Sequence, residues 1–109
     1  MSETLIVLTN VPDAETAAMI ARRLVEARLA ACVNVLGPCR SVYRWQGAIE
    51  DDAEVPLLIK TTRARYAELE RALVALHPAE VPEILALPVA AGLPDYLAWA
   101  AAETAPDTD

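Results

Sequence analysis

The sequence predicts an α+β fold in which four strands and three helices form a single domain over residues 1–109. Short apolar runs rich in β-branched residues, typical of buried strands, alternate with segments whose apolar residues recur at helical spacing. Proline and glycine lie between many of these segments, where turns are expected. A chain of 109 residues is also long enough to bury roughly two-thirds of its unfolded surface around one core.

The first strand and the first helix are expected at the N-terminal end. Residues 4–10 (TLIVLTN) form an apolar run that ends at Val11-Pro12, which predicts a buried strand. Asp13 is the expected N-cap of the helix, and Glu15 places negative charge in its first turn. The residues that share the apolar face of this helix are Ala17, Ile20, Ala21, Leu24 and Leu29.

Residues 30–45 and 49–60 predict two long strands joined by a turn at Gln46-Gly47. Gly37-Pro38 interrupts the first of these strands and predicts a bulge or a kink. Pro56 has no N–H to donate, so we expect it at a sheet edge or at a bulge. The pair is longer than a small domain needs, which predicts a protruding hairpin arm. The solvated acidic patch near its tip comprises Glu50, Asp51, Asp52 and Glu54.

The second helix is expected to start at Thr61 or Thr62, either of which can cap it, and to end before Pro78. Its apolar positions are Tyr66, Leu69, Leu73 and Leu76. Residues 84–89 predict the fourth strand, residues 95–103 a last helix, and residues 104–109 a frayed tail.

This order of elements, βαββαβ with a C-terminal helix, is that of the ferredoxin-like sandwich. In that fold two helices cover one face of a four-stranded antiparallel sheet, and the other face stays open. Because an apolar sheet face is stable only when something covers it, we expect further copies of the chain to pack there.

Charge and composition narrow the range of partners. A net charge of −7 argues against binding to nucleic acid and to anionic membranes. The start MSETLIVLTN lacks the basic residues of a signal peptide, and no apolar run approaches the length of a membrane span. We therefore expect a cytoplasmic protein.

The two cysteines, Cys32 and Cys39, fit a reducing compartment. An extended strand places them on the order of 23 Å apart, which is too far for a disulfide. We expect Cys32 to pack as a small apolar residue and Cys39 to be an exposed thiol.

Several segments together resemble the CutA family of divalent-cation tolerance proteins, in register from about Leu5 to Trp99. They are RLAACVNV, SVYRWQG, the E-x-x-L-L-I-K-T pattern from Glu54 to Thr61, HPAEVPEI, ALPV and DYLAW. The resemblance implies a ferredoxin-like subunit in a tightly packed homotrimer, similar in plan to the PII signalling proteins. It also implies that the long arm extends the sheet of a neighbouring subunit.

The resemblance further implies a link to copper and other divalent metals. In bacterial relatives the implied copper ligands are a cysteine at the end of the first strand and a histidine pair before the HP motif. These positions hold Thr9 and Leu76-His77 in this chain, and Ala79 replaces the aromatic residue of the motif. The chain thus departs from the metal-site pattern, with one imidazole and no thiolate.

His77 is nevertheless the main candidate ligand for copper or another divalent cation, with Glu80 or Glu83 assisting. In an extended segment Glu80 lies about 10 Å from His77 and points to the opposite face. One chain therefore offers a single good nitrogen ligand, where a tight site takes three or four. The alternative, which the sequence favours, is a structural histidine that bonds carbonyl groups at a helix end.

Two clusters that contain aromatic residues are candidates for binding another molecule or subunit. Tyr43, Arg44 and Trp45 either line a small-molecule cleft between subunits or anchor an interface, where these residue types are enriched. We favour the interface, and we expect Tyr96 and Trp99 to pack the last helix onto the same neighbour.

The sequence does not indicate an enzyme. It has three glycines and no phosphate-binding loop, and its one histidine has no serine or cysteine placed beside it in the sequence. We therefore expect a non-enzymatic homotrimer that takes part in divalent-metal tolerance or response through weak or indirect binding. The alternative is a PII-like signalling or scaffold trimer that binds a small molecule or a partner protein in its intersubunit clefts. A hydrolase is a third hypothesis, and it would depend on His77, Glu80 or Glu83.

Overall fold

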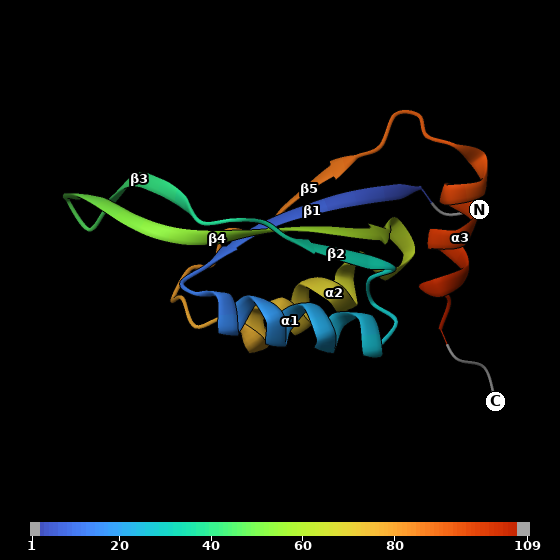
Figure 1. The fold of residues 1–109 in the computed structure, drawn as a ribbon, viewed down its shortest axis with the longest axis horizontal. Helices are drawn as coiled ribbons and strands as arrows, with labels where there is room; N and C mark the ends of the chain where they lie inside the picture. The colour runs from blue at the N-terminus through green and yellow to red at the C-terminus, as the bar shows by residue number, and fades with distance from the viewer. Residues whose placement is uncertain (1–2, 107–109) are drawn as a thin grey trace.

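The computed structural model describes residues 3–106 and places one layer of strands over two helices, with a third helix at the far end (Figure 1). The elements in chain order are β1 (Thr4–Val11), α1 (Ala14–Glu26), β2 (Cys32–Val35), β3 (Cys39–Trp45), β4 (Ala48–Thr62), α2 (Arg63–Leu76), β5 (Leu85–Pro88) and α3 (Pro94–Glu103). The α+β class, the order of the elements and the placement of α1 and α2 on one face are confirmed.

All strand pairs are antiparallel, and the order across the sheet is β2-β4-β1-β5. The strand expected over residues 30–45 is two strands: β2 pairs with the inner part of β4, and β3 pairs with its outer part. Counted as one interrupted strand, β2 and β3 complete the expected βαββαβ pattern. The protruding arm therefore consists of β3 and the first half of β4, which give the molecule its longest dimension of 47 Å.

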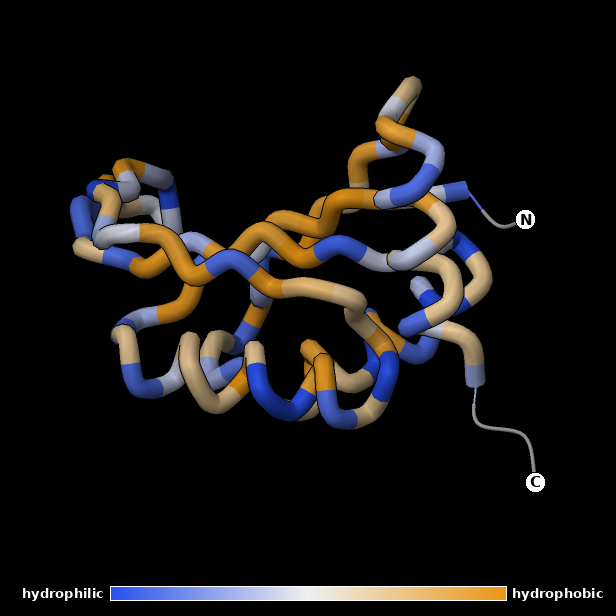
Figure 2. The backbone as a smooth tube through the Cα atoms, turned by 45° about the vertical axis from the view of Figure 1, so that its right-hand side comes forward, coloured by the Kyte–Doolittle hydropathy of each residue, from blue (hydrophilic) through white to orange (hydrophobic). Residues whose placement is uncertain are grey.

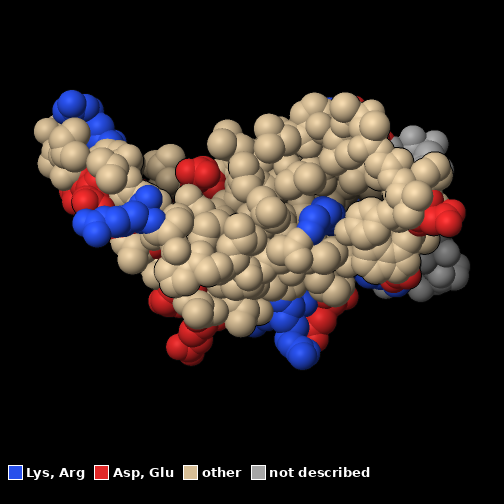
Figure 3. Space-filling view, turned by 45° about the horizontal axis from the view of Figure 1, so that its top comes forward, with Lys and Arg blue, Asp and Glu red and all other residues tan. Residues whose placement is uncertain are grey.

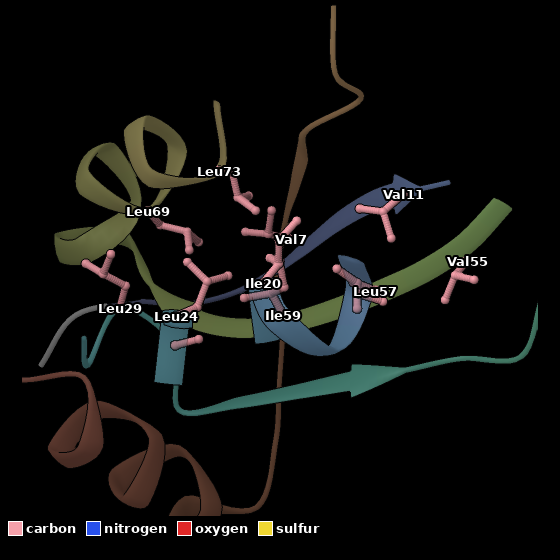
Figure 4. Packing of buried hydrophobic residues seen from close by; sticks show 12 residues of the cluster. Val7, Val11, Ile20, Leu24, Leu29, Val55, Leu57, Ile59, Leu69 and Leu73 are labelled. Carbon is pink, nitrogen blue, oxygen red and sulfur yellow. The ribbon is translucent and has the colours of Figure 1, made fainter. Parts of the chain in front are cut away.

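The core lies between the sheet and helices α1 and α2 (Figure 4). Alternate residues of β1 and β4 point to this side, as the period of a strand requires. The largest apolar side chains that are completely or almost completely buried are Leu5, Val7, Val11, Ile20, Leu24, Leu57, Ile59, Leu69 and Leu73. The core faces predicted for the two helices supply four of these residues, Ile20, Leu24, Leu69 and Leu73. Tyr66 and Leu76 are partly buried against the same core. Leu29 is buried as expected, but it lies beyond the end of α1 at Glu26 and not on the helix.

The two helices begin differently. Asp13 caps α1 as expected, since its carboxylate accepts a hydrogen bond from the Thr16 N–H at 2.7 Å. This bond lowers the pKa of Asp13. The expected start of α2 is confirmed, since Thr62 occupies the N-cap position, but among the described residues its side chain makes no capping bond. Thr61 donates instead to the Leu29 carbonyl at 2.7 Å, which ties β4 to the segment after α1.

A bulge separates the sheet from the arm. Val35 pairs with Leu57 and Cys39 pairs with Glu54, so three residues of one strand lie opposite two of the other. Pro56 lies opposite this bulge, where its carbonyl accepts a hydrogen bond from the Leu36 N–H at 3.0 Å. The bulge prediction is confirmed. Pro56 occupies the second of its two expected positions, at the bulge, because β4 is a central strand and not an edge.

The face of the sheet that points away from α1 and α2 is apolar and open. Leu85 and Leu87 of β5 are 54% and 50% exposed, and they pair with Leu8 and Ile6 of β1. The strands are the most hydrophobic part of the chain in Figure 2. Charged side chains gather on the arm and along the lower edge in Figure 3, and few interrupt the broad surface between them. This is the open apolar face expected from the order of elements.

The C-terminal end is held more firmly than expected. Thr104 is buried, and its hydroxyl donates to the Ala100 carbonyl at 2.8 Å. Arg28 donates to the carbonyls of Ala102 and Ala105 at 3.0 and 3.1 Å. Thr104 and Ala105 are therefore not frayed, which corrects the expected tail at these positions, and residues 107–109 of that tail lie outside the described residues.

Candidate functional site

A cleft of about 610 Å³ lies where the base of the arm meets the segment after α2. Its lining comes from four parts of the chain, namely the end of β1, strand β3, the middle of β4 and residues 77–83. The lining residues are Asn10, Ser41, Val42, Tyr43, Trp45, Glu54, His77, Ala79, Glu80, Val81 and Glu83. The arm and the HP motif are far apart in the sequence, but in the structure they line one cleft within a single chain.

Strand β3 places Ser41, Tyr43 and Trp45 on one face, because alternate residues of a strand share a face. Tyr43 donates a hydrogen bond from its hydroxyl to Asp52 at 2.6 Å. This bond, together with burial and the nearby negative charges, raises the pKa of Tyr43 to about 12. The hydroxyl is therefore protonated at neutral pH, and the tyrosine ring is fixed against β4.

Arg44 is not among the residues that line this cleft. It alternates with Tyr43 and Trp45 along β3 and so lies on the other face of the arm, which also carries Arg40. Arg40 forms a two-pronged ion pair with Asp51, with both N–O distances 2.9 Å. The predicted cluster of Tyr43, Arg44 and Trp45 is thus divided between two faces.

His77 is buried, and both of its ring nitrogens are engaged. The Ala79 N–H donates to Nδ1 at 3.0 Å, which assigns the ring proton to Nε2. Nε2 lies 2.6 Å from the Asn10 carbonyl oxygen and donates to it. The ring therefore ties the end of β1 to the turn after α2. It bonds a carbonyl, as the structural alternative expected, but the carbonyl belongs to β1 and not to a helix end.

The other candidate metal residues do not gather around His77. Glu80 and Glu83 are exposed, and no group of three His, Cys, Asp or Glu within residues 3–106 is arranged to hold a metal ion. Thr9, at the position of the implied cysteine ligand, is fully buried, and its hydroxyl has no hydrogen-bond partner in the described structure. Leu76 packs against the hydrophobic core.

Tyr96 and Trp99 lie at the other end of the molecule, on α3 (Figure 1). Their ring centroids are 5.5 Å apart, and Trp99 lines a second, smaller hollow with Arg28 and Glu103. Burial, followed by the neighbouring Cys32, raises the pKa of Tyr96. This aromatic pair is therefore separate from the cleft at the arm.

Both cysteines are free and half-buried. Lys60 Nζ lies 3.9 Å from Cys32 Sγ on the open face of the sheet. Cys39 Sγ lies 3.8 Å from the Ser41 hydroxyl at the base of the arm. The full exposure expected for Cys39 is wrong, because pairing with β4 covers part of its side chain.

Sequence reasoning missed several residues of the cleft, of which Asn10 and Glu54 carry polar groups that matter to it. Asn10 contributes the carbonyl that His77 bonds, and a backbone acceptor gives no signal in the sequence. Glu54 was assigned to a solvated patch near the arm's tip, but it pairs with Cys39 at the base and is half-buried. Knowledge of the register between β3 and β4 would have placed Glu54 at the base of the arm, opposite Cys39.

The fold and the site define a small α+β protein with one antiparallel sheet, a protruding arm and an acidic, aromatic cleft at the arm's base. The profile of the family described as CutA1 divalent ion tolerance protein matches residues 5–103. The chain belongs to this CutA1 family, and the resemblance seen in the sequence is confirmed.

Comparisons with individual relatives support the same family assignment. The chain is 51% identical over 94 residues to the divalent-cation tolerance protein CutA of Thermus thermophilus, covering 86% of this chain and 91% of that protein. It is 47% identical over 88 residues to protein CutA of Mus musculus, covering 81% of this chain and only 50% of the mouse protein. The solved structure of the periplasmic divalent cation tolerance protein CutA of Archaeoglobus fulgidus has a TM-score of 0.91 and 34% identity, covering 94% of this chain and 99% of that one.

These names refer to the tolerance of divalent cations and to no chemical reaction. Between residues 3 and 106, no helix has both the length and the apolar character needed to cross a bilayer.

Proposed function

We propose that this chain is a subunit of a homotrimer that takes part in the response to divalent metals, copper among them, without catalysing a reaction. The proposal rests on the cleft at the base of the arm. There the HP motif of a divalent ion tolerance family lies beside carboxylates from two parts of the chain. Metal binding in this cleft is weak or indirect.

The hydrogen bonds of His77 explain why binding is weak. A metal ion can take the Nδ1 lone pair only by displacing the Ala79 N–H, and it can take Nε2 only after the ring proton has left. Either change leaves a backbone group without its partner, which costs about 1–3 kcal/mol. The exposed carboxylates of Glu80 and Glu83 carry no such cost, so they are the ligands that a metal meets first.

The exposed apolar surface supports the homotrimer. Val42 and Ile49 on the arm are 66% and 62% exposed, and all four residues of β5 are exposed at the sheet edge. Unpaired strand edges and large apolar patches are typical of surfaces that bind another chain. An arm that pairs with a neighbour's edge and an open face packed against other copies would cover both features. Sedimentation velocity at micromolar concentration tests this, and a folded monomer would contradict it.

Calorimetric titration with Cu²⁺ and Zn²⁺ tests the metal proposal. The double variant Glu80→Gln/Glu83→Gln is expected to lose most of the binding. The matched control, Glu15→Gln/Glu70→Gln, removes the same charge from exposed positions on the helices and is expected to bind as the parent does. Equal binding by the two double variants would show that the cleft is not the metal site.

A second candidate function is a signalling or scaffold trimer that binds a small molecule or a partner protein in the cleft. The observation that favours it is the size of the cleft, about 610 Å³, which lies within the usual range of about 300–1,000 Å³ for small-molecule sites. A thermal-shift screen of small molecules tests it, and a screen in which metals alone stabilise the protein would count against it. The cytoplasmic location stays a prediction, which fractionation of cells tests.

A further inference from the structure

The cleft at the base of the arm combines negative charge with aromatic surface. Its charged lining residues are Glu54, Glu80 and Glu83, and its large aromatic residues are Tyr43 and Trp45. No lysine or arginine of the described chain belongs to the lining. A ligand that enters this cleft therefore meets carboxylates with no cation to neutralise them, which favours a positively charged ligand.

The arrangement of the carboxylates suits a large cation better than a bare metal ion. A divalent metal needs several ligand atoms at about 2.0–2.6 Å, and no suitable group of three occurs among residues 3–106. An organic ammonium ion has a diffuse charge and an apolar surface. It is attracted by carboxylates without coordinating them, and by aromatic faces within about 6 Å of the ring centroid.

One of the two aromatic rings is held in place before any ligand binds. The hydroxyl of Tyr43 is bonded to Asp52 at 2.6 Å, and β3 is paired with β4 along its whole length. Trp45, two residues further along the same face, is half-buried. Because the Tyr43 ring is already ordered, a ligand loses less free energy in fixing it.

We propose that this cleft binds a small organic ammonium ion. The ammonium group packs against the rings of Tyr43 and Trp45, and its charge is balanced by Glu54, Glu80 and Glu83. The inference rests on the second candidate function, a small molecule in the cleft, and is independent of the metal proposal.

Trp45 fluorescence provides the assay. Trp99 is the other tryptophan, so the full-length variant Trp99→Phe has Trp45 as its single reporter. This protein is titrated with choline and, separately, with 3,3-dimethyl-1-butanol, which has the same shape and no charge. We expect saturable quenching by choline and binding of the neutral alcohol at least about tenfold weaker, since tenfold corresponds to about 1.4 kcal/mol and a desolvated cation–π contact contributes up to about 2 kcal/mol.

Two pairs of variants in the Trp99→Phe background locate the binding. Glu80→Gln/Glu83→Gln is expected to weaken choline binding at least about tenfold, while Glu15→Gln/Glu70→Gln, with the same net charge, is expected to leave it unchanged. Equal binding of choline and the alcohol, or equal loss in both double variants, would overturn the inference.

Three further outcomes separate the proposals. A neutral or anionic compound that quenches Trp45 when choline does not would overturn the inference and leave the second candidate function standing. A parent protein that binds choline but does not bind Zn²⁺ or Cu²⁺ would contradict the metal proposal alone. Quenching of Trp45 by neither choline nor any compound of the thermal-shift screen would overturn the ammonium inference and the cleft function together.

Discussion

Replacing His77 should destabilise the fold substantially, because the ring joins the end of β1 to the turn after α2. Nε2 donates to the Asn10 carbonyl at the end of β1, and Nδ1 accepts from the Ala79 N–H after α2. The side chain is 8% exposed, so water cannot readily replace either bond. His77→Ala removes both bonds and leaves a cavity.

The magnitude follows from the two bonds. Each buried hydrogen bond contributes about 1 kcal/mol net, and a buried group left without a partner costs about 1–3 kcal/mol, so we expect His77→Ala to lower the free energy of unfolding by about 2–4 kcal/mol. Asn places an acceptor near the position of Nδ1, and Gln places a donor near the position of Nε2. His77→Asn and His77→Gln should therefore each retain one bond and lose about 1–2 kcal/mol.

Guanidinium unfolding followed by circular dichroism measures these losses. All variants are compared at one protein concentration, because the stability of an oligomer depends on concentration. Glu80→Gln, an exposed change in the same segment, is the control and should leave the midpoint unchanged. A loss below about 0.5 kcal/mol for His77→Ala would refute the structural role, since surface changes alone produce effects of that size.

Three other changes test the arm and the core. Gln46→Asn should raise the free energy of unfolding by up to about 1 kcal/mol, because Gln46 has a φ of 49° that asparagine tolerates better; an unchanged midpoint in guanidinium would argue against strain there. In a chain whose other two tyrosines are phenylalanine, absorbance at 295 nm should titrate Tyr43 at a pKa of about 12, and Asp52→Asn should return that pKa toward 10. Because the folded pKa of Tyr43 is raised, the stability that this bond provides is complete below pH 10 and is lost as the pH rises toward 12; equal titration with and without Asp52 would contradict the bond. Leu73→Ala, at a fully buried core position, should cost about 2–5 kcal/mol in the same unfolding assay, and a loss under about 1 kcal/mol would place Leu73 outside the core.

Much of the fold could be predicted because its signals are local. The Asp13 cap and the stripe formed by Ala17, Ile20 and Leu24 depend on residues within a few positions of each other, and both are confirmed. The turn at Gln46-Gly47 is also local, and both residues have the positive φ that a tight hairpin turn favours. The hydrogen bond from the Thr61 hydroxyl to the Leu29 carbonyl, in contrast, is a tertiary contact that no local signal predicts.

The cleft could be predicted only in part. His77, Glu80 and Glu83 come from one short segment and Tyr43 and Trp45 from another, and all five candidates line the cleft. That the two sets meet depends on how the arm leaves the sheet and on where β1 ends. Asn10 shows the difficulty, because it takes part through its backbone carbonyl. Every residue has such a carbonyl, so the type of residue at position 10 gives no signal.

The bulge at residues 36–38 places Ser41, Tyr43 and Trp45 of β3 on one face of the arm, at the cleft. In β2 the even-numbered residues Cys32 and Asn34 lie opposite Lys60 and Leu58. After the bulge the odd-numbered residues of β3 take that face, and Tyr43 lies opposite Glu50. A strand without the extra residue would keep the even register, and Arg44 would replace Tyr43 and Trp45 on this face, since a shift of one residue reverses every side chain. The cleft would then contain a cation among its glutamates and lose its aromatic surface. Gly37-Pro38 thus affects the cleft at a distance, because a local interruption of pairing determines whether aromatic or basic residues of β3 share its face.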